Sequence, residues 1–93
     1  MTPDQVRHAV MRYYREIGRI NGQRLEQCKH SYLAGIRIPR DMILAHLRWM
    51  CIVVNREHAH DNIEKAMRWL GFIQGALWAL GIKTIEDLKE DNK

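Results

Sequence analysis

The sequence predicts an all-α fold, a small bundle of four to five helices that is completed by oligomerisation. Apolar residues recur three or four positions apart in several segments, which is the spacing of one face of a helix. Helix-capping and helix-ending residues bound these segments, and no segment alternates apolar and polar residues as a half-buried strand would. The 93 residues form a single domain, residues 1–93, whose core is so small that a second copy would usefully enlarge it.

The first helix is predicted to begin at Thr2-Pro3-Asp4-Gln5. Thr2 can cap the helix, Pro3 suits its first turn, and Gln5 completes a capping box. An apolar stripe at helical spacing follows, made of Val6, Val10, Tyr13, Ile17 and Ile20. Four basic residues fall on the opposite face: His8, Arg12, Arg15 and Arg19. This pattern predicts an amphipathic helix that buries the stripe and presents a basic face.

A turn is expected at Asn21-Gly22. Beyond it, a weaker helical pattern ends at Gly35 and consists of Leu25, Cys28, Tyr32 and Leu33. One long helix is the alternative, because a helix tolerates a glycine at a cost of about 1 kcal/mol; we favour the break. Residues 36–39 should form a short extended connector, because a residue before proline avoids helical angles.

The next helix is predicted to open at Pro39 or Arg40, with a main apolar stripe of Ile43, Leu47, Met50 and Val54. Further apolar residues surround this stripe: Leu44, Trp49, Cys51, Ile52 and Val53. A helix that is apolar nearly all round is buried on more than one side. We therefore expect it at the centre of the bundle or against a partner chain, with Trp49 and Ile52 as candidate contacts.

A polar interval at residues 55–60 should separate this helix from the following one, which Asp61 can cap. The buried face of the following helix is predicted to consist of Ile63, Ala66, Met67, Leu70, Ile73, Leu77 and Leu80. Two glycines four residues apart, Gly71 and Gly75, lie within it. They predict a groove where another helix approaches closely, within the chain or between chains, flanked by Phe72 and Trp78.

Residues typical of a helix C-terminus follow this segment. Gly81 fits the left-handed position just past the last turn, with Ile82 packing back on Leu77 as in a Schellman motif. Thr84 then starts a last short helix, and residues 90–93 are expected to fray.

Charge is unevenly distributed: of a net charge of +4, residues 1–40 carry eight Lys/Arg against three Asp/Glu. A basic segment can meet an acidic partner or nucleic acid, although a solvated helix face is the interpretation we favour. The two cysteines make no disulfide framework, and no apolar run marks a signal peptide. The longest apolar stretch, residues 42–54, is too short to cross a membrane. We expect a cytoplasmic protein with free thiols and no membrane contact.

Three clusters of reactive residues stand out in the sequence as candidate chemical sites. His58 and His60, beside Glu57 and Asp61, resemble part of a zinc or nickel site but lack further converging ligands. Cys28 and His30 stand two apart on a presumed helix, so their side chains diverge. The terminal acidic residues, Glu86, Asp87, Glu90 and Asp91, have no facing carboxylate pair. We predict no catalytic residue, no metal site and no cofactor.

The stretch Arg68-Trp69-Leu70-Gly71-Phe72-Ile73-Gln74-Gly75 is followed by Leu77-Trp78, Gly81-Ile82 and Thr84-Ile85-Glu86-Asp87-Leu88-Lys89. This pattern resembles the C-terminal half of small uncharacterised proteins encoded by tailed bacteriophages and prophages. The resemblance covers about a third of the chain and carries no activity with it. It implies an accessory gene of a phage or prophage and a bacterial host cytoplasm.

Together these observations predict a non-enzymatic accessory protein that acts as a helical protein-interaction or regulatory module. We expect a homodimer that binds a host or phage protein through apolar contacts at Trp49, Ile52, Gly71, Phe72, Gly75 and Trp78. The alternative is a nucleic-acid-binding protein that uses the basic face of the first helix, at His8, Arg12, Arg15 and Arg19.

Overall fold

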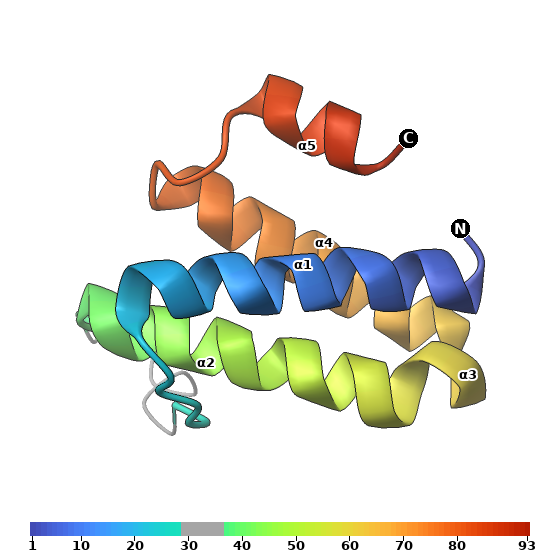
Figure 1. The fold of residues 1–93 in the computed structure, drawn as a ribbon, viewed down its shortest axis with the longest axis horizontal. Coiled ribbons are helices and arrows are strands. Elements are labelled where there is room, and N and C mark those ends of the chain that lie inside the picture. The colour runs from blue at the N-terminus through green and yellow to red at the C-terminus, as the bar shows by residue number, and fades with distance from the viewer. Residues whose placement is uncertain (29–36) are drawn as a thin grey trace.

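A computed structural model describes residues 1–28 and 37–93, and every regular element in those ranges is helical (Figure 1). The elements are α1 (Pro3–Asn21), α2 (Arg40–Val53), the π-helix η2 (Val54–His58), α3 (Ala59–Asp61), α4 (Ile63–Ala79) and α5 (Ile85–Asp91). The predicted all-α class is confirmed. α1, α2 and α4 enclose one apolar core, and α5 lies at the edge of the bundle (Figure 1).

Helix α1 begins as predicted. The Thr2 hydroxyl accepts a hydrogen bond from the Gln5 amide at 3.2 Å, and the Gln5 side chain accepts one from the Thr2 amide at 2.8 Å. The predicted stripe is buried, together with Ala9, except that Ile20 is exposed in the last turn. Gly22, with φ 72°, ends the helix, so the break that we favoured over one long helix is confirmed.

The second predicted helix does not form over residues 24–28, which have no regular structure. There the chain passes along α2, where the Glu26 amide donates to the Ala45 carbonyl at 3.4 Å and the Cys28 amide donates to His46 Nδ1 at 3.0 Å. These bonds to α2 replace the bonds that a helix would make within itself. The remaining residues of that pattern, including Tyr32, Leu33 and Gly35, lie outside the described residues.

Helix α2 packs against both α1 and α4, so its broad apolar surface is explained by contacts within the bundle. Most of its predicted apolar residues are buried: Leu44, Leu47, Met50, Cys51 and Val54. Ile43, Trp49, Ile52 and Val53 are half-buried. A partner chain is therefore not needed to account for most of this apolar surface.

The predicted polar interval at residues 55–60 is helical instead. A π turn spans Val54–His58, where the Ala59 amide bonds to the Val54 carbonyl five residues earlier. Arg56 and Glu57 of this turn are exposed and Asn55 and His58 are half-buried, while Val54 and Ala59 are buried. The cap of the next helix is Asn62 rather than Asp61, because the Asn62 side chain accepts a bond from the Lys65 amide at 3.1 Å.

Helix α4 buries Ala66, Leu70, Ile73 and Leu77 as predicted, whereas Met67 is exposed. Its end is the predicted Schellman motif: the Ile82 amide donates to the Leu77 carbonyl at 2.9 Å, and Gly81 has φ 75°. Thr84 then caps α5 in a capping box with Asp87.

The C-terminal residues are anchored, although the sequence predicts that they fray. Asp91 accepts a hydrogen bond from the Tyr13 hydroxyl at 2.7 Å and pairs with Arg12 at 3.1 Å. Asn92 accepts one at 2.7 Å from Gln74, a buried polar residue of α4 that the apolar pattern did not indicate. Helix α5 has no buried residue of its own, so this polar network holds it in place.

Candidate functional site

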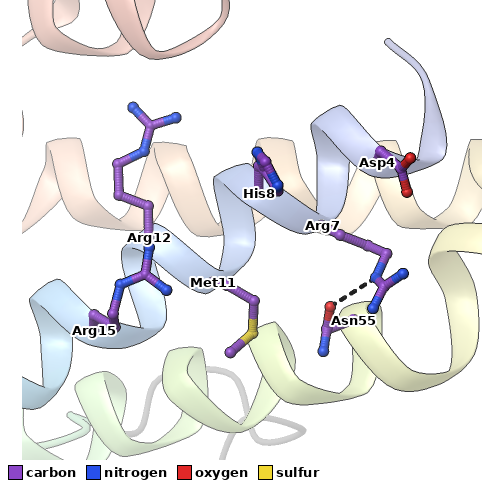
Figure 2. Close-up of a pocket in the computed structure, with 7 residues that line it drawn as sticks. All are labelled: Asp4, Arg7, His8, Met11, Arg12, Arg15 and Asn55. Carbon is purple, nitrogen blue, oxygen red and sulfur yellow. Dashed lines mark hydrogen bonds between the residues drawn. The ribbon is translucent and has the colours of Figure 1, made fainter.

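Two adjoining hollows lie along α1, on the side away from its apolar stripe. The first has a volume of about 650 Å³ and is lined by Asp4, Arg7, His8, Met11, Arg12, Arg15 and Asn55 (Figure 2). The second has a volume of about 420 Å³ and is lined by Tyr14, Arg15, Gly18, Arg19, Gln23 and Arg48. Arg15 borders both hollows. We call Arg7, His8, Arg12, Arg15 and Arg19 the α1 basic face; it contains all four basic residues that the sequence predicts.

The members of the first hollow are held in different ways. Arg7 reaches toward η2, where its Nε donates to Asn55 Oδ1 at 3.0 Å (Figure 2), and its Nη1 lies 3.1 Å from His60 Nε2. Arg12 extends in the opposite direction, toward α5 and Asp91. His8 and Arg15 are exposed. The predicted basic face is therefore formed. Arg12, however, is partly neutralised by the carboxylate of Asp91, a residue that was predicted to lie in a frayed tail.

The second hollow contains a buried charge that the sequence analysis did not select. Arg48 of α2 is 3% exposed, and its guanidinium carbon lies 3.8 Å from the centre of the Tyr14 ring. Its Nη1 donates to the Gln23 carbonyl at 2.8 Å, and its Nη2 donates to the Gln23 side-chain oxygen at 2.8 Å. Its Nε donates to the Tyr14 carbonyl at 3.4 Å. All of these acceptors are neutral.

The charges of this region are poorly balanced. Arg12 pairs with Asp91, but no ion pair within residues 1–28 and 37–93 includes Arg7, Arg15, Arg19 or Arg48. Asp4 is the one carboxylate among the described residues that line the two hollows. Cationic residues with so few anions around them create a positive potential that attracts an anionic ligand.

The residues predicted to make apolar partner contacts lie on two helices, α2 and α4. Phe72 is 58% exposed and Trp78 is 54% exposed, but six helical positions at about 100° each put them on faces roughly 120° apart. Phe72 borders an apolar hollow of about 270 Å³ beside His46 and Ala76, and Trp78 does not. Trp49 and Ile52, which are half-buried, belong to a different helix.

The predicted glycine groove makes no close contact within the described chain. A Cβ atom added at Gly71 or Gly75 would meet no atom of the described residues within 4 Å. Both glycines are exposed on α4. No second helix among the described residues lies against these glycines, and a contact between two chains stays a prediction.

Aromatic rings also form a row that sequence spacing did not indicate. The ring of Trp49 lies 5.4 Å from that of His46 and 6.0 Å from that of Trp69, and Trp69 lies 4.9 Å from His58. His58 thus packs on a tryptophan while His60 lies beside Arg7, so the two histidines have different partners. No three His, Cys, Asp or Glu side chains of the described ranges come together as metal ligands would.

The Cys51 thiol is not arranged as a nucleophile. Burial raises the pKa of the Cys51 thiol to about 12, so it stays protonated at neutral pH. Cys28 is also buried, and its predicted neighbour His30 lies outside the described residues. Burial lowers the pKa of His46, whose Nδ1 accepts the bond from the Cys28 amide.

No protein-family model matches the chain, and no curated protein or solved structure matches it significantly. No helix in the part of the chain that the structure describes is long and apolar enough to cross a bilayer.

Proposed function

We propose that this protein is a non-enzymatic module that binds nucleic acid through the α1 basic face. One observation carries the proposal. Two adjoining hollows share Arg15, and their described lining residues include five arginines and one histidine but a single carboxylate, that of Asp4. A protein that binds nucleic acid gains most of its affinity from cations placed against phosphates. Of the two functions that the sequence suggests, the geometry supports the nucleic-acid alternative better than the apolar interface.

The kind of cation supports a phosphate ligand. The basic face contains arginine and one histidine but no lysine, and the planar guanidinium donates two parallel hydrogen bonds to a phosphate. Arg12 and Arg19 are seven residues apart, about 10 Å along the helix axis. That length corresponds to about three phosphates of one DNA strand. Because these residues lie along one helix side, we expect contacts with the sugar–phosphate backbone and little sequence preference.

The proposed absence of catalysis rests on the reactive side chains themselves. The Cys51 thiol is buried with a raised pKa, His46 accepts a backbone bond, and His58 packs against Trp69. A nucleophile needs an adjacent base in hydrogen-bond reach. The Cys51 thiol has no such neighbour among its described contacts.

Fluorescence anisotropy with a labelled 20-base duplex and the matching single strands of DNA and RNA would test the proposal. Arg15→Gln with Arg19→Gln should weaken binding at least tenfold and reduce the salt slope by about 2, because two phosphate contacts are lost. Arg56→Gln with Arg68→Gln is the matched control, since both residues are exposed and line neither hollow. That control should change affinity less than twofold.

Two results would contradict the proposal. Equal losses in both double variants would indicate a general effect of net charge. No binding to any of the nucleic acids at low salt, with tight binding to polyglutamate, would assign the basic face to an acidic protein instead.

A second candidate function rests on the exposed aromatics of α4. Large apolar side chains exposed over half their area, such as Phe72 and Trp78, commonly mark protein contacts. We propose, as this second function, a phage-type accessory protein in the bacterial cytoplasm that forms a homodimer and binds a host or phage protein. Light scattering would test it: the wild type should have at least twice the 11 kDa chain mass, and Phe72→Ser with Trp78→Ser should be monomeric. A monomeric wild type would contradict the dimer.

A further inference from the structure

We propose that the hollow beside Arg48 is a specific seat for one phosphate group. Arg48 is the buried part of its lining, and Arg15 and Arg19 are the exposed part. This proposal rests on the proposed function in one respect: the hollow would hold one phosphate of the bound nucleic acid. The same seat would accept inorganic phosphate, which shares the chemistry.

The state of Arg48 is the first argument. A buried charge is unfavourable unless a counter-charge or hydrogen bonds compensate it. Here every described acceptor is neutral, and the Tyr14 ring supplies the remaining contact. The three hydrogen bonds use three of the five guanidinium N–H groups, which leaves one on each terminal nitrogen. A phosphate in the hollow would accept those hydrogen bonds and supply the missing negative charge.

Gly18 provides the second argument. A Cβ atom at this position would lie 3.4 Å from Arg48 Nε and 3.6 Å from Nη2, in ordinary van der Waals contact with the guanidinium. Glycine is the poorest helix former after proline, yet it stands inside α1 at this point. The hollow has about 420 Å³, ample for a phosphate and several waters of about 30 Å³ each. Because Gly18 also lines the hollow, a large side chain at this position would take up part of the space beside the guanidinium.

Charge is the third argument. No described residue that lines this hollow carries a carboxylate, whereas the first hollow contains Asp4 and loses Arg12 in part to Asp91. Three guanidinium groups around one space favour a ligand with several oxygens and more than one negative charge. A phosphate fits that description better than a carboxylate, which offers two oxygens and one charge.

Titration with inorganic phosphate, followed by ³¹P NMR at constant ionic strength, would test the seat. Gly18→Leu should fill the hollow while favouring the helix, and should raise the dissociation constant for phosphate at least tenfold. Gly75→Leu is the matched control, because a Cβ there meets no described atom within 4 Å, and it should stay within twofold of the wild type. Arg48→Lys should also weaken binding tenfold, since lysine keeps the positive charge but cannot donate two parallel hydrogen bonds to one phosphate.

The source of the phosphate is resolved by oligonucleotides with and without a 5′-phosphate. Gly18→Leu should weaken both equally if the seat holds an internal phosphate, and only the phosphorylated one if it holds a terminal phosphate. If Gly18→Leu binds inorganic phosphate like the wild type, the seat is wrong and the proposed function stands. If Gly18→Leu loses phosphate while Arg15→Gln with Arg19→Gln leaves nucleic-acid affinity unchanged, the seat stands and the proposed function is wrong.

Discussion

Helices α1 and α5 are in contact, yet different forces hold them in the bundle. α1 buries five residues of one face, from Val6 to Ile17, in the apolar core. α5 buries none and is held by hydrogen bonds and ion pairs that converge on Asp91, whose side chain is 11% exposed. Burial is non-directional and survives small shifts, whereas a polar network depends on a few atoms in good geometry. The bundle therefore has an edge that single polar substitutions can loosen.

The largest expected effect lies in the apolar core. Leu47 is fully buried on α2 in the core cluster that includes the α1 stripe. Leu47→Ala should reduce the free energy of unfolding by about 2–5 kcal/mol, because it leaves a cavity as well as losing apolar contact. Urea denaturation measures this change. Because α1 rests on the core, its backbone amides should exchange faster with solvent throughout the helix.

A smaller and more local effect is expected at the polar edge. Asp91→Asn should cost about 1–3 kcal/mol, since Tyr13 and Arg12 lose a charged acceptor. Hydrogen exchange should increase in α5 and stay unchanged in the first two turns of α1. Glu90→Gln is the matched control, because its pair with Lys93 is exposed and worth under about 1 kcal/mol. If both variants protect α5 equally, the Asp91 network does not hold this helix.

Alkaline pH should act on the same contact. Burial, and secondly the adjacent Asp91 carboxylate, raise the pKa of Tyr13 well above its ordinary value of 10. Above pH 10 the unfolded chain loses this proton while the folded chain keeps it, so stability falls as pH rises. Ultraviolet titration should show one tyrosine that ionises late in the wild type and none in Tyr13→Phe. Early ionisation of every tyrosine in the wild type would mean that the hydroxyl is not held as described.

The smallest expected effect tests the exposed side of α4. Gly75→Ala should stabilise the chain by about 0.5–1 kcal/mol, because alanine favours the helix and the added methyl group meets open space. Thermal melts at several protein concentrations would measure it. A destabilisation that grows with protein concentration would show that Gly75 packs against a second chain, as the sequence analysis allowed.

The comparison of α1 with α5 also explains what the sequence could predict. Caps and apolar spacing are local signals, so the Thr2 capping box, the break at Gly22 and the Schellman motif at Gly81 were all predicted correctly. The anchoring of Asp91 by Tyr13 joins residues 78 positions apart, and no periodic pattern records such a pair. Polar contacts between distant segments are consequently the part of the fold that sequence reasoning missed.

The candidate site likewise contains residues that the sequence predicted and one residue, Arg48, that it did not. The exposed arginines of α1 were predicted, because they fall opposite a clear apolar stripe. Arg48 was missed, since a single charge within the apolar run of α2 indicates an interruption, not a buried group with distant partners. Its partners, Tyr14 and Gln23, come from α1 and from the turn that follows. The isolated arginine in an otherwise apolar segment was the one available signal.

The π turn after α2 also sets the rotational phase of the chain. In a regular α-helix a residue five positions on is rotated by about 140°, so Val54 and Ala59 would face different sides. The wider turn brings both to the core and leaves the polar residues between them exposed or half-buried. Removing one residue here would restore a regular helix and keep the residues beyond it on the same side, because the wider turn accommodates one extra residue. Asn55, which accepts a hydrogen bond from Arg7, lies in this turn. The direction in which the Arg7 side chain points therefore depends on the wider turn.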